Sequence, residues 1–144
     1  MKFKEGLHII KEIQVLEEMK MKVSVYTDKA PEAIGPYSQA IVANGMVYTS
    51  GQLGMNAQGV LQGETAAEQA EQSIQNLKAV LEEAGSSIDN VVKTTVFLAD
   101  INDFVAVNEV YGKHFTKPYP ARSAVEVANL PKGAKVEIEV IATL

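Results

Sequence analysis

The residue best suited to chemistry is Arg122, because it is the only arginine among the 13 lysines and arginines of this 144-residue chain. A guanidinium is planar and permanently charged. It holds a carboxylate or a phosphate with two parallel hydrogen bonds, which a lysine ammonium does not. Arg122 begins the predicted strand 122–130, with Glu126 on the same strand face. The spacing leaves two interpretations open, an anion-binding site and a structural ion pair with Glu126.

Two carboxylates alternate with apolar residues along the last predicted strand, residues 134–142. Glu137 or Glu139 can hold and polarise a water molecule on such a strand. Either can also lie on a solvated face or pair with Lys135. From spacing alone, the solvated face is the favoured interpretation.

Polar residues with chemical potential also occur in two loops and one helix. Tyr37 follows a rigid Gly-Pro pair that fixes its direction, and Ser50 precedes Gly51, which lets a ligand approach the backbone closely. Asn108 lies in a predicted helix, where asparagine has no local advantage. It either points a polar group at a site or faces water. His114 lies on the apolar stripe of the same helix and is expected to be a satisfied core or interface histidine.

The composition excludes several classes of function. The chain has no cysteine, which removes disulfides, thiol nucleophiles and zinc–thiolate sites. A net charge of -5 disfavours binding to a phosphate backbone. The sequence contains no P-loop, G-x-G-x-x-G or H-E-x-x-H motif, and its aspartates have no recognisable metal-ligand spacing. No apolar run approaches the roughly 20 residues of a membrane span, and the first twenty residues lack the apolar core of a signal peptide. By exclusion, the expected location is the cytoplasm.

The length fits one domain, which we place at residues 21–144. Apolar residues recur at helical spacing in residues 1–20, and two interpretations of this segment stay open. It is either an extension upstream of the domain or a first helix that packs on the core.

Turn and cap signals divide the domain into strands and helices. Asn44-Gly45 predicts a type I′ hairpin turn, Thr65 and Glu68 form a capping box, and Gly85 ends that helix. Asp100 is a candidate N-cap for the second helix. The expected strands are 23–27, the two arms of the hairpin, 90–100, 122–130 and 134–142, and the expected helices are 65–85 and 100–115.

This order predicts an α+β sandwich, in which one mainly antiparallel sheet has two helices packed on one face. The last strand places its apolar residues on one side, namely Val136, Ile138, Val140 and Ala142. If the helices cover that side, the partly apolar opposite face needs another subunit to bury it. We therefore expect a homo-oligomer.

Several segments resemble the RidA family of reactive intermediate deaminases: "APEAIGPYSQA", "VYTSGQL", "VVKTTVFLADINDF", "VNEVYG" and "PARSAVEVANLPKGAKVEIEVIA". The similarity runs from about Val23 to Ala142. The last segment is the most specific, because it combines the sole arginine, a proline turn and paired glutamates.

The resemblance implies a chorismate-mutase-like fold and a homotrimer with sites in clefts between subunits. It implies hydrolysis of 2-imino acids, such as 2-iminopropanoate and 2-iminobutanoate, to 2-oxo acids and ammonia, without a cofactor or metal. These imines derive from enamines released by pyridoxal-phosphate-dependent dehydratases, which would be functional partners. No membrane partner is implied.

The resemblance also assigns roles to residues. Arg122 matches the arginine that binds the substrate carboxylate, and Glu137 matches the glutamate that holds the attacking water. The predicted substrate-binding residues are Tyr37, Ser50, Gly51, Asn108 and Ala124. Ala124 is a departure, because many members have cysteine there. An imine is already electrophilic, so its hydrolysis needs no thiol nucleophile.

Three other functions remain open. The chain could be a non-catalytic regulatory module that binds 2-oxo acids. It could act on RNA, as has been described for relatives, although its acidic charge argues against this. Arg122 could also serve only as an ion pair at a trimer interface.

Overall fold

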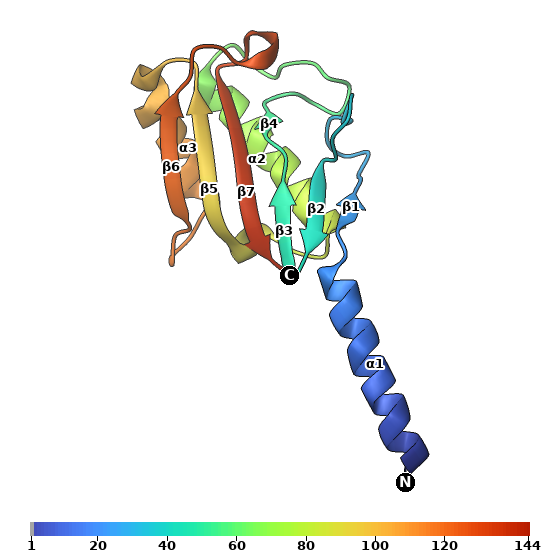
Figure 1. Cartoon of the computed structure of the whole chain (residues 1–144). Helices are drawn as coiled ribbons and strands as arrows, with labels where there is room; N and C mark the ends of the chain where they lie inside the picture. Colours follow the sequence, from blue (N-terminus) through green and yellow to red (C-terminus); the bar gives the residue numbers. More distant parts are fainter. Residues whose placement is uncertain (1) are drawn as a thin grey trace.

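The computed structural model describes residues 2–144, apart from the side chains of residues 18–20. The described residues form one seven-stranded sheet with two helices against one of its faces (Figure 1). The strands are β1 Val23–Val25, β2 Ala40–Ala43, β3 Met46–Thr49, β4 Gln52–Leu53, β5 Val91–Leu98, β6 Ala121–Glu126 and β7 Val136–Thr143. The helices are α1 Lys2–Lys20, α2 Ala66–Glu83 and α3 Phe104–His114, with 3₁₀ turns at Ile88–Asn90, Ile101–Asp103 and Pro131–Gly133.

The strand order is β1-β2-β3-β7-β5-β6, with β4 also pairing with β7. Only β5 and β6 run parallel, because α3 returns the chain to the starting end of the sheet between them. The α+β class and the mainly antiparallel sheet predicted from the sequence are confirmed. The short strand β4 was not predicted.

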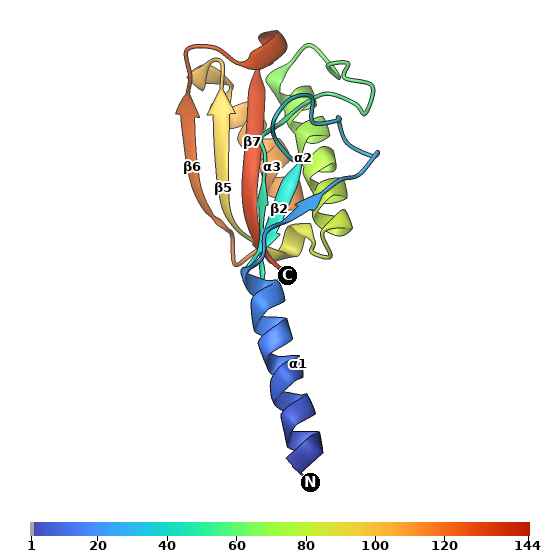
Figure 2. The same cartoon turned by 45° about the vertical axis from the view of Figure 1, so that its right-hand side comes forward.

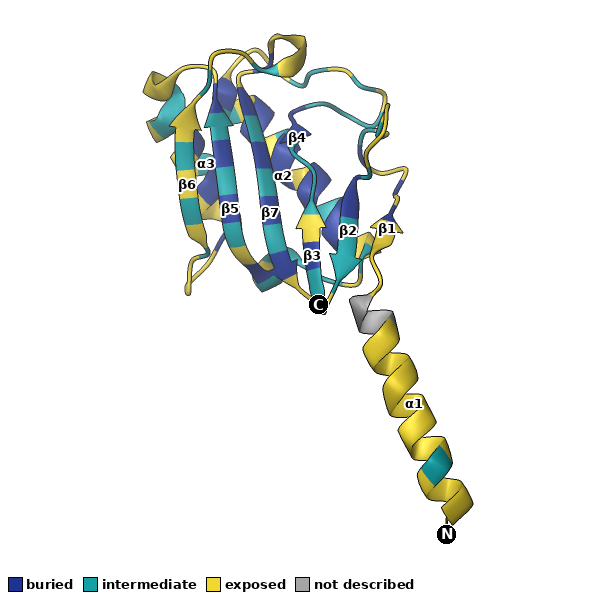
Figure 3. Cartoon of the chain, in the orientation of Figure 1, coloured by how far each residue is buried: buried dark blue, intermediate teal, exposed yellow. Residues whose placement is uncertain are grey.

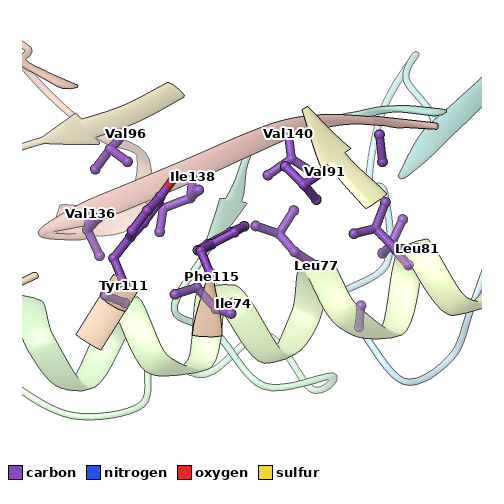
Figure 4. Packing of buried hydrophobic residues seen from close by; sticks show 14 of the residues in the cluster. Ile74, Leu77, Leu81, Val91, Val96, Tyr111, Phe115, Val136, Ile138 and Val140 are labelled. Carbon is purple, nitrogen blue, oxygen red and sulfur yellow. The ribbon is translucent and has the colours of Figure 1, made fainter. Parts of the chain in front are cut away.

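The core lies between the sheet and the two helices α2 and α3, both of which cover the same face (Figure 2). Figure 4 shows this packing around the long strand β7. The apolar residues of β7 are buried against the helices as predicted, at Val136, Ile138, Val140 and Ala142. The facing residues of α2 include Ile74, Leu77 and Leu81. Among the described residues, no helix lies over the other face of the sheet (Figure 2).

The local signals in the sequence act as expected. Asn44 and Gly45 have φ angles of 51° and 71°, as a type I′ turn requires. Thr65 caps α2 by accepting a hydrogen bond from the Glu68 backbone N–H at 3.2 Å. Gly85 follows the helix with a φ of 87°, the left-handed conformation that favours glycine.

The start of the second helix differs from the prediction. The Asp100 carboxylate accepts a hydrogen bond from the Asn102 backbone N–H at 2.9 Å, so it caps the 3₁₀ turn Ile101–Asp103. Helix α3 begins afterwards, at Phe104. An Asx-type bond to the second following residue favours such a tight turn over an immediate α-helix.

Helix α1 projects from one end of the domain and lies away from its core (Figures 1 and 3). Large apolar side chains of its described part are exposed, namely Phe3, Leu7, Ile9, Ile10, Ile13, Val15 and Leu16. In the described residues, no helix is both long enough and apolar enough to cross a membrane. The division of the chain into 1–20 and 21–144 remains a prediction.

Candidate active site

The Arg122 side chain lies on the helix-covered side of β6, between the sheet and α3. Its Nη1 donates a hydrogen bond to Asn108 Oδ1 at 2.7 Å. The guanidinium carbon lies 4.7 Å from the centre of the Tyr111 ring and 5.3 Å from the centre of the Phe104 ring. These three partners are spaced four and three residues apart in α3, so they share one helix face. Arg122 is therefore held by an amide and two aromatic faces.

A hollow of about 490 Å³ opens beside this arginine. Its lining residues are Asn108, Tyr111, Gly112, Tyr119, Pro120 and Arg122. We call this set the arginine half-site. The sequence predicted Arg122 and Asn108 as site residues, and the structure brings these two into direct contact.

Glu126 does not pair with Arg122. Its carboxylate instead accepts a hydrogen bond from the Ile101 backbone N–H at 3.0 Å. Among the described side chains, the ion pairs are His8–Glu12 and Glu71–His114. The interpretation of Arg122 as an ion-pair partner of Glu126 is therefore wrong, and no carboxylate of the described residues neutralises the guanidinium.

A second hollow, of about 390 Å³, contains the other predicted catalytic residue, Glu137. The predicted residues Tyr37, Ser50 and Gly51 line the same hollow. We call these four residues the glutamate half-site. The Glu137 carboxylate lies so close to Gly51 that a Cβ atom at that position would overlap it. A side chain at position 51 would therefore displace the Glu137 carboxylate from this position.

Two hydrogen-bonded segments shape the glutamate half-site. Ser50 donates its hydroxyl to the Ser38 carbonyl at 2.6 Å. Gln39 is buried, and its amide nitrogen donates to the carbonyls of Thr27 and Pro31 at 3.0 Å and 2.9 Å. Gln39 thus fixes the loop that carries Tyr37. Sequence analysis missed this role of Gln39. The hydrogen-bond partners of Gln39 lie 12 and 8 residues away, and no local sequence pattern indicates them.

The surroundings of Glu137 change its acidity. Burial raises the pKa of the Glu137 carboxyl, and repulsion from the neighbouring Glu139 raises it further. A carboxylate with a raised pKa accepts a proton more readily, as a general base must.

The two half-sites lie on opposite faces of the sheet. Arg122 pairs with Thr94 of β5, and Thr94 is buried under the helices. Directly opposed residues share a sheet face, so Arg122 lies on the helix side, and so does Ala124 two residues later. Glu137 alternates with the buried Val136 and Ile138, so it points to the uncovered face. One chain therefore does not bring Arg122 and Glu137 together.

His114 is satisfied, as the sequence predicted. Its two ring nitrogens contact the Glu71 carboxylate and, at 2.9 Å, the Lys78 ammonium, which links α3 to α2. Outside the masked positions, no three His, Asp or Glu side chains gather as a metal site would need.

The fold and the half-sites define an α+β protein. The arginine half-site lies on the helix-covered face of its sheet, and the glutamate half-site lies on the other face. Residues 27–144 match the family described as Endoribonuclease L-PSP. The human 2-iminobutanoate/2-iminopropanoate deaminase is 51% identical over 119 residues, which cover 82% of this chain and 87% of the relative. The chain therefore belongs to this family, which confirms the resemblance to RidA.

Solved structures agree with this assignment. RidA from the Antarctic bacterium Psychrobacter sp. PAMC 21119 is 48% identical, with a TM-score of 0.79, and the match covers 85% of this chain and 99% of that one. TdcF from E. coli, solved with bound serine, is 43% identical with a TM-score of 0.79, and the match covers 85% and 98%. The imine deaminase predicted from the sequence agrees with the names of these relatives.

Proposed function

We propose that this protein is a 2-iminobutanoate/2-iminopropanoate deaminase. It hydrolyses 2-imino acids to 2-oxo acids and ammonia, and it works as a homotrimer with its sites between subunits. The observation that carries the proposal concerns Arg122. Asn108 holds its guanidinium through one hydrogen bond, other N–H donors remain unused, and no carboxylate of the described residues pairs with it.

The Arg122 guanidinium suits a carboxylate ligand. It has five N–H donors, and one of them is used by Asn108. The guanidinium carbon lies over the Tyr111 and Phe104 rings, and the remaining donors are left for a ligand. A 2-imino or 2-oxo acid carries such a carboxylate. The serine bound by the relative TdcF is an amino acid with the same group, which supports this ligand class.

A complete site needs two copies of the chain, because Glu137 and Arg122 lie on opposite sheet faces. If the arginine half-site of one copy meets the glutamate half-site of the next, the contact joins two different surfaces. Such head-to-tail contacts close into rings, and the homotrimer of the resemblance is a ring of three. β6 also lies at the end of the strand order, so one of its edges is unpaired in the part of the chain that the structure describes.

The uncovered sheet face supports the same assembly. It carries large apolar side chains, including Tyr48 of β3 and Val125 of β6, which are 45% and 44% exposed. Apolar surface of this kind marks an interaction site. Packing between subunits would remove it from water.

The proposed reaction uses positioning and one general base. Arg122 fixes the carboxylate of the protonated imine, which places the imine carbon near Glu137 of the neighbouring copy. Glu137 takes a proton from water as the oxygen bonds to the imine carbon. Glu137 then returns that proton to the carbinolamine nitrogen. The carbon–nitrogen bond breaks, ammonia leaves with the bonding electrons, and the hydroxyl proton is released to water as the carbonyl forms. The products are ammonia and a 2-oxo acid.

The cellular source of the substrate follows from its chemistry. A 2-imino acid is the tautomer of an enamine, and pyridoxal-phosphate-dependent dehydratases acting on serine and threonine release such enamines. We propose these enzymes as functional partners. RNA cleavage, suggested by the family description, remains an alternative that the net charge of -5 disfavours.

A coupled assay tests the function. A dehydratase generates 2-aminoacrylate from serine, and pyruvate formation is followed with and without this protein, with Arg122→Ala as the matched variant. We expect acceleration by the wild type and none by Arg122→Ala at unchanged oligomeric state. A folded wild type that gives no acceleration but binds 2-oxobutanoate would instead favour a regulatory binding module.

A further inference from the structure

We propose that Tyr111 and Thr94 act as a hydrogen-bonded pair that positions the Arg122 guanidinium for its carboxylate ligand. The inference rests on the proposed function and adds two positioning residues to it. Neither residue need touch the substrate; both act through Arg122.

The pair joins α3 to the strand beside Arg122. The Tyr111 hydroxyl and the Thr94 Oγ1 are 2.8 Å apart. Both residues are buried, with Tyr111 6% and Thr94 0% exposed. Thr94 is also the residue directly opposite Arg122 in the β5–β6 pairing. The hydrogen bond therefore ties the aromatic ring to the backbone position that carries the arginine.

These contacts form a closed path. Arg122 bonds to Asn108 in α3, Tyr111 follows one turn later, and its hydroxyl returns to Thr94 next to Arg122. On its other side, the Tyr111 ring stacks on Phe115 with 4.2 Å between ring centres. The ring thus has little freedom to shift or tilt, and the cation beside it takes its orientation from the ring face.

The buried hydroxyls of Tyr111 and Thr94 each need a hydrogen-bond partner. A buried hydroxyl without a partner costs free energy, and here each satisfies the other. The Tyr111 environment also keeps its hydroxyl neutral, since burial raises the pKa of the phenol despite opposing effects of Thr94 and Arg122. A phenolate would pair with the guanidinium and compete with the substrate carboxylate. A neutral ring attracts the cation through its π face and leaves the N–H donors available.

The test measures recognition of the carboxylate itself. We would titrate the full-length wild type and variants with 2-oxobutanoate and with its uncharged amide, 2-oxobutanamide, by calorimetry. The variants are Tyr111→Phe and Thr94→Val, which each remove one hydroxyl, their double mutant, and Tyr111→Leu, which removes the ring. Arg122→Ala is the reference for loss of carboxylate binding. Tyr26→Phe is the matched control, because Tyr26 is exposed and outside both half-sites.

We expect Tyr111→Leu to weaken 2-oxobutanoate binding roughly 3- to 30-fold, the range of a cation–π contact. Each hydroxyl deletion should weaken it about 2- to 5-fold, and the double mutant no more than the single ones, because both remove the same hydrogen bond. Affinity for the amide should stay at the wild-type value in every variant, as should both affinities in Tyr26→Phe.

The outcomes separate the inference from the function beneath it. Suppose that folded Tyr111→Phe and Thr94→Val bind 2-oxobutanoate as tightly as the wild type, while Arg122→Ala loses that binding. This result would overturn the inference and leave the proposed function standing. Equal losses for acid and amide would show a merely structural pair and would also overturn it. A wild type that does not prefer the acid over the amide would refute the carboxylate role of Arg122 itself.

Discussion

Mixing two inactive variants should restore activity if each site is shared between subunits. Arg122→Ala destroys the arginine half-site and leaves the glutamate half-site intact, and Glu137→Gln does the reverse. Arg122 and Glu137 lie on opposite faces of the sheet, so each complete site takes one group from each of two chains. In a homogeneous preparation of either variant, every site lacks one of the two groups and should be inactive. A mixed oligomer contains contacts in which an intact Arg122 meets an intact Glu137.

The size of the recovery follows from counting. A site is intact when its arginine comes from a Glu137→Gln chain and its glutamate from an Arg122→Ala chain. At equal mixing each condition is met about half of the time, so about a quarter of the sites are complete. The mixture should therefore show about a quarter of the wild-type kcat per site with an unchanged KM.

The assay is coupled pyruvate formation after the two variants are unfolded together and refolded, with equal oligomeric state checked by size-exclusion chromatography. The matched control mixes Arg122→Ala with Asn108→Asp. That second change places a carboxylate at the atom that accepts the Arg122 hydrogen bond, so both lesions fall in the arginine half-site and no recovery is expected. No recovery in the first mixture, with mixed oligomers demonstrated, would refute the shared site.

Three further outcomes are expected. Gly51→Ala should lower kcat by about 100-fold, with the fold retained on circular dichroism. The new Cβ displaces the Glu137 carboxylate, and a small misplacement of a catalytic group has such an effect. A wild-type kcat would contradict the position assigned to Glu137. Activity should fall as the pH drops through the Glu137 pKa, because the protonated carboxyl no longer accepts a proton from water. Glu139→Gln removes one of the effects that raise this pKa, so the acidic limb of the kcat/KM profile should move to lower pH. A move to higher pH would contradict the role of Glu137. A chain starting at Met21 should keep its activity and its oligomeric state, and loss of the oligomer on size-exclusion chromatography would show that α1 contributes to assembly.

Local features of the fold could be predicted because their causes are local. The Thr65–Glu68 capping box and the Asn44-Gly45 turn depend on residues within one turn of the chain. The alternation along β7 similarly shows one apolar face. These signals are enough to order the strands and helices and to assign the α+β class.

The arrangement of the site depends on long-range pairing and could not be predicted in the same way. The alternation in β6 shows that it has two faces, but not which one the helices cover; the register with β5 decides that Arg122 lies beneath α3. Sequence analysis did not single out Tyr111, because its bond to Thr94 spans 17 positions. Glu126 shared the Arg122 strand face in the sequence, yet its partner is the Ile101 backbone, 25 positions away.

If each site is shared between two chains, as proposed, the placement of Arg122 and Glu137 on opposite faces of one sheet makes the output of this protein depend on its own abundance. A single chain carries both groups but cannot use them on one molecule. Near the dissociation constant of the assembly, the rate should therefore rise more steeply than in proportion to the amount of protein. Newly made chains would be inactive until they met one another, and dilution would silence the enzyme without unfolding it.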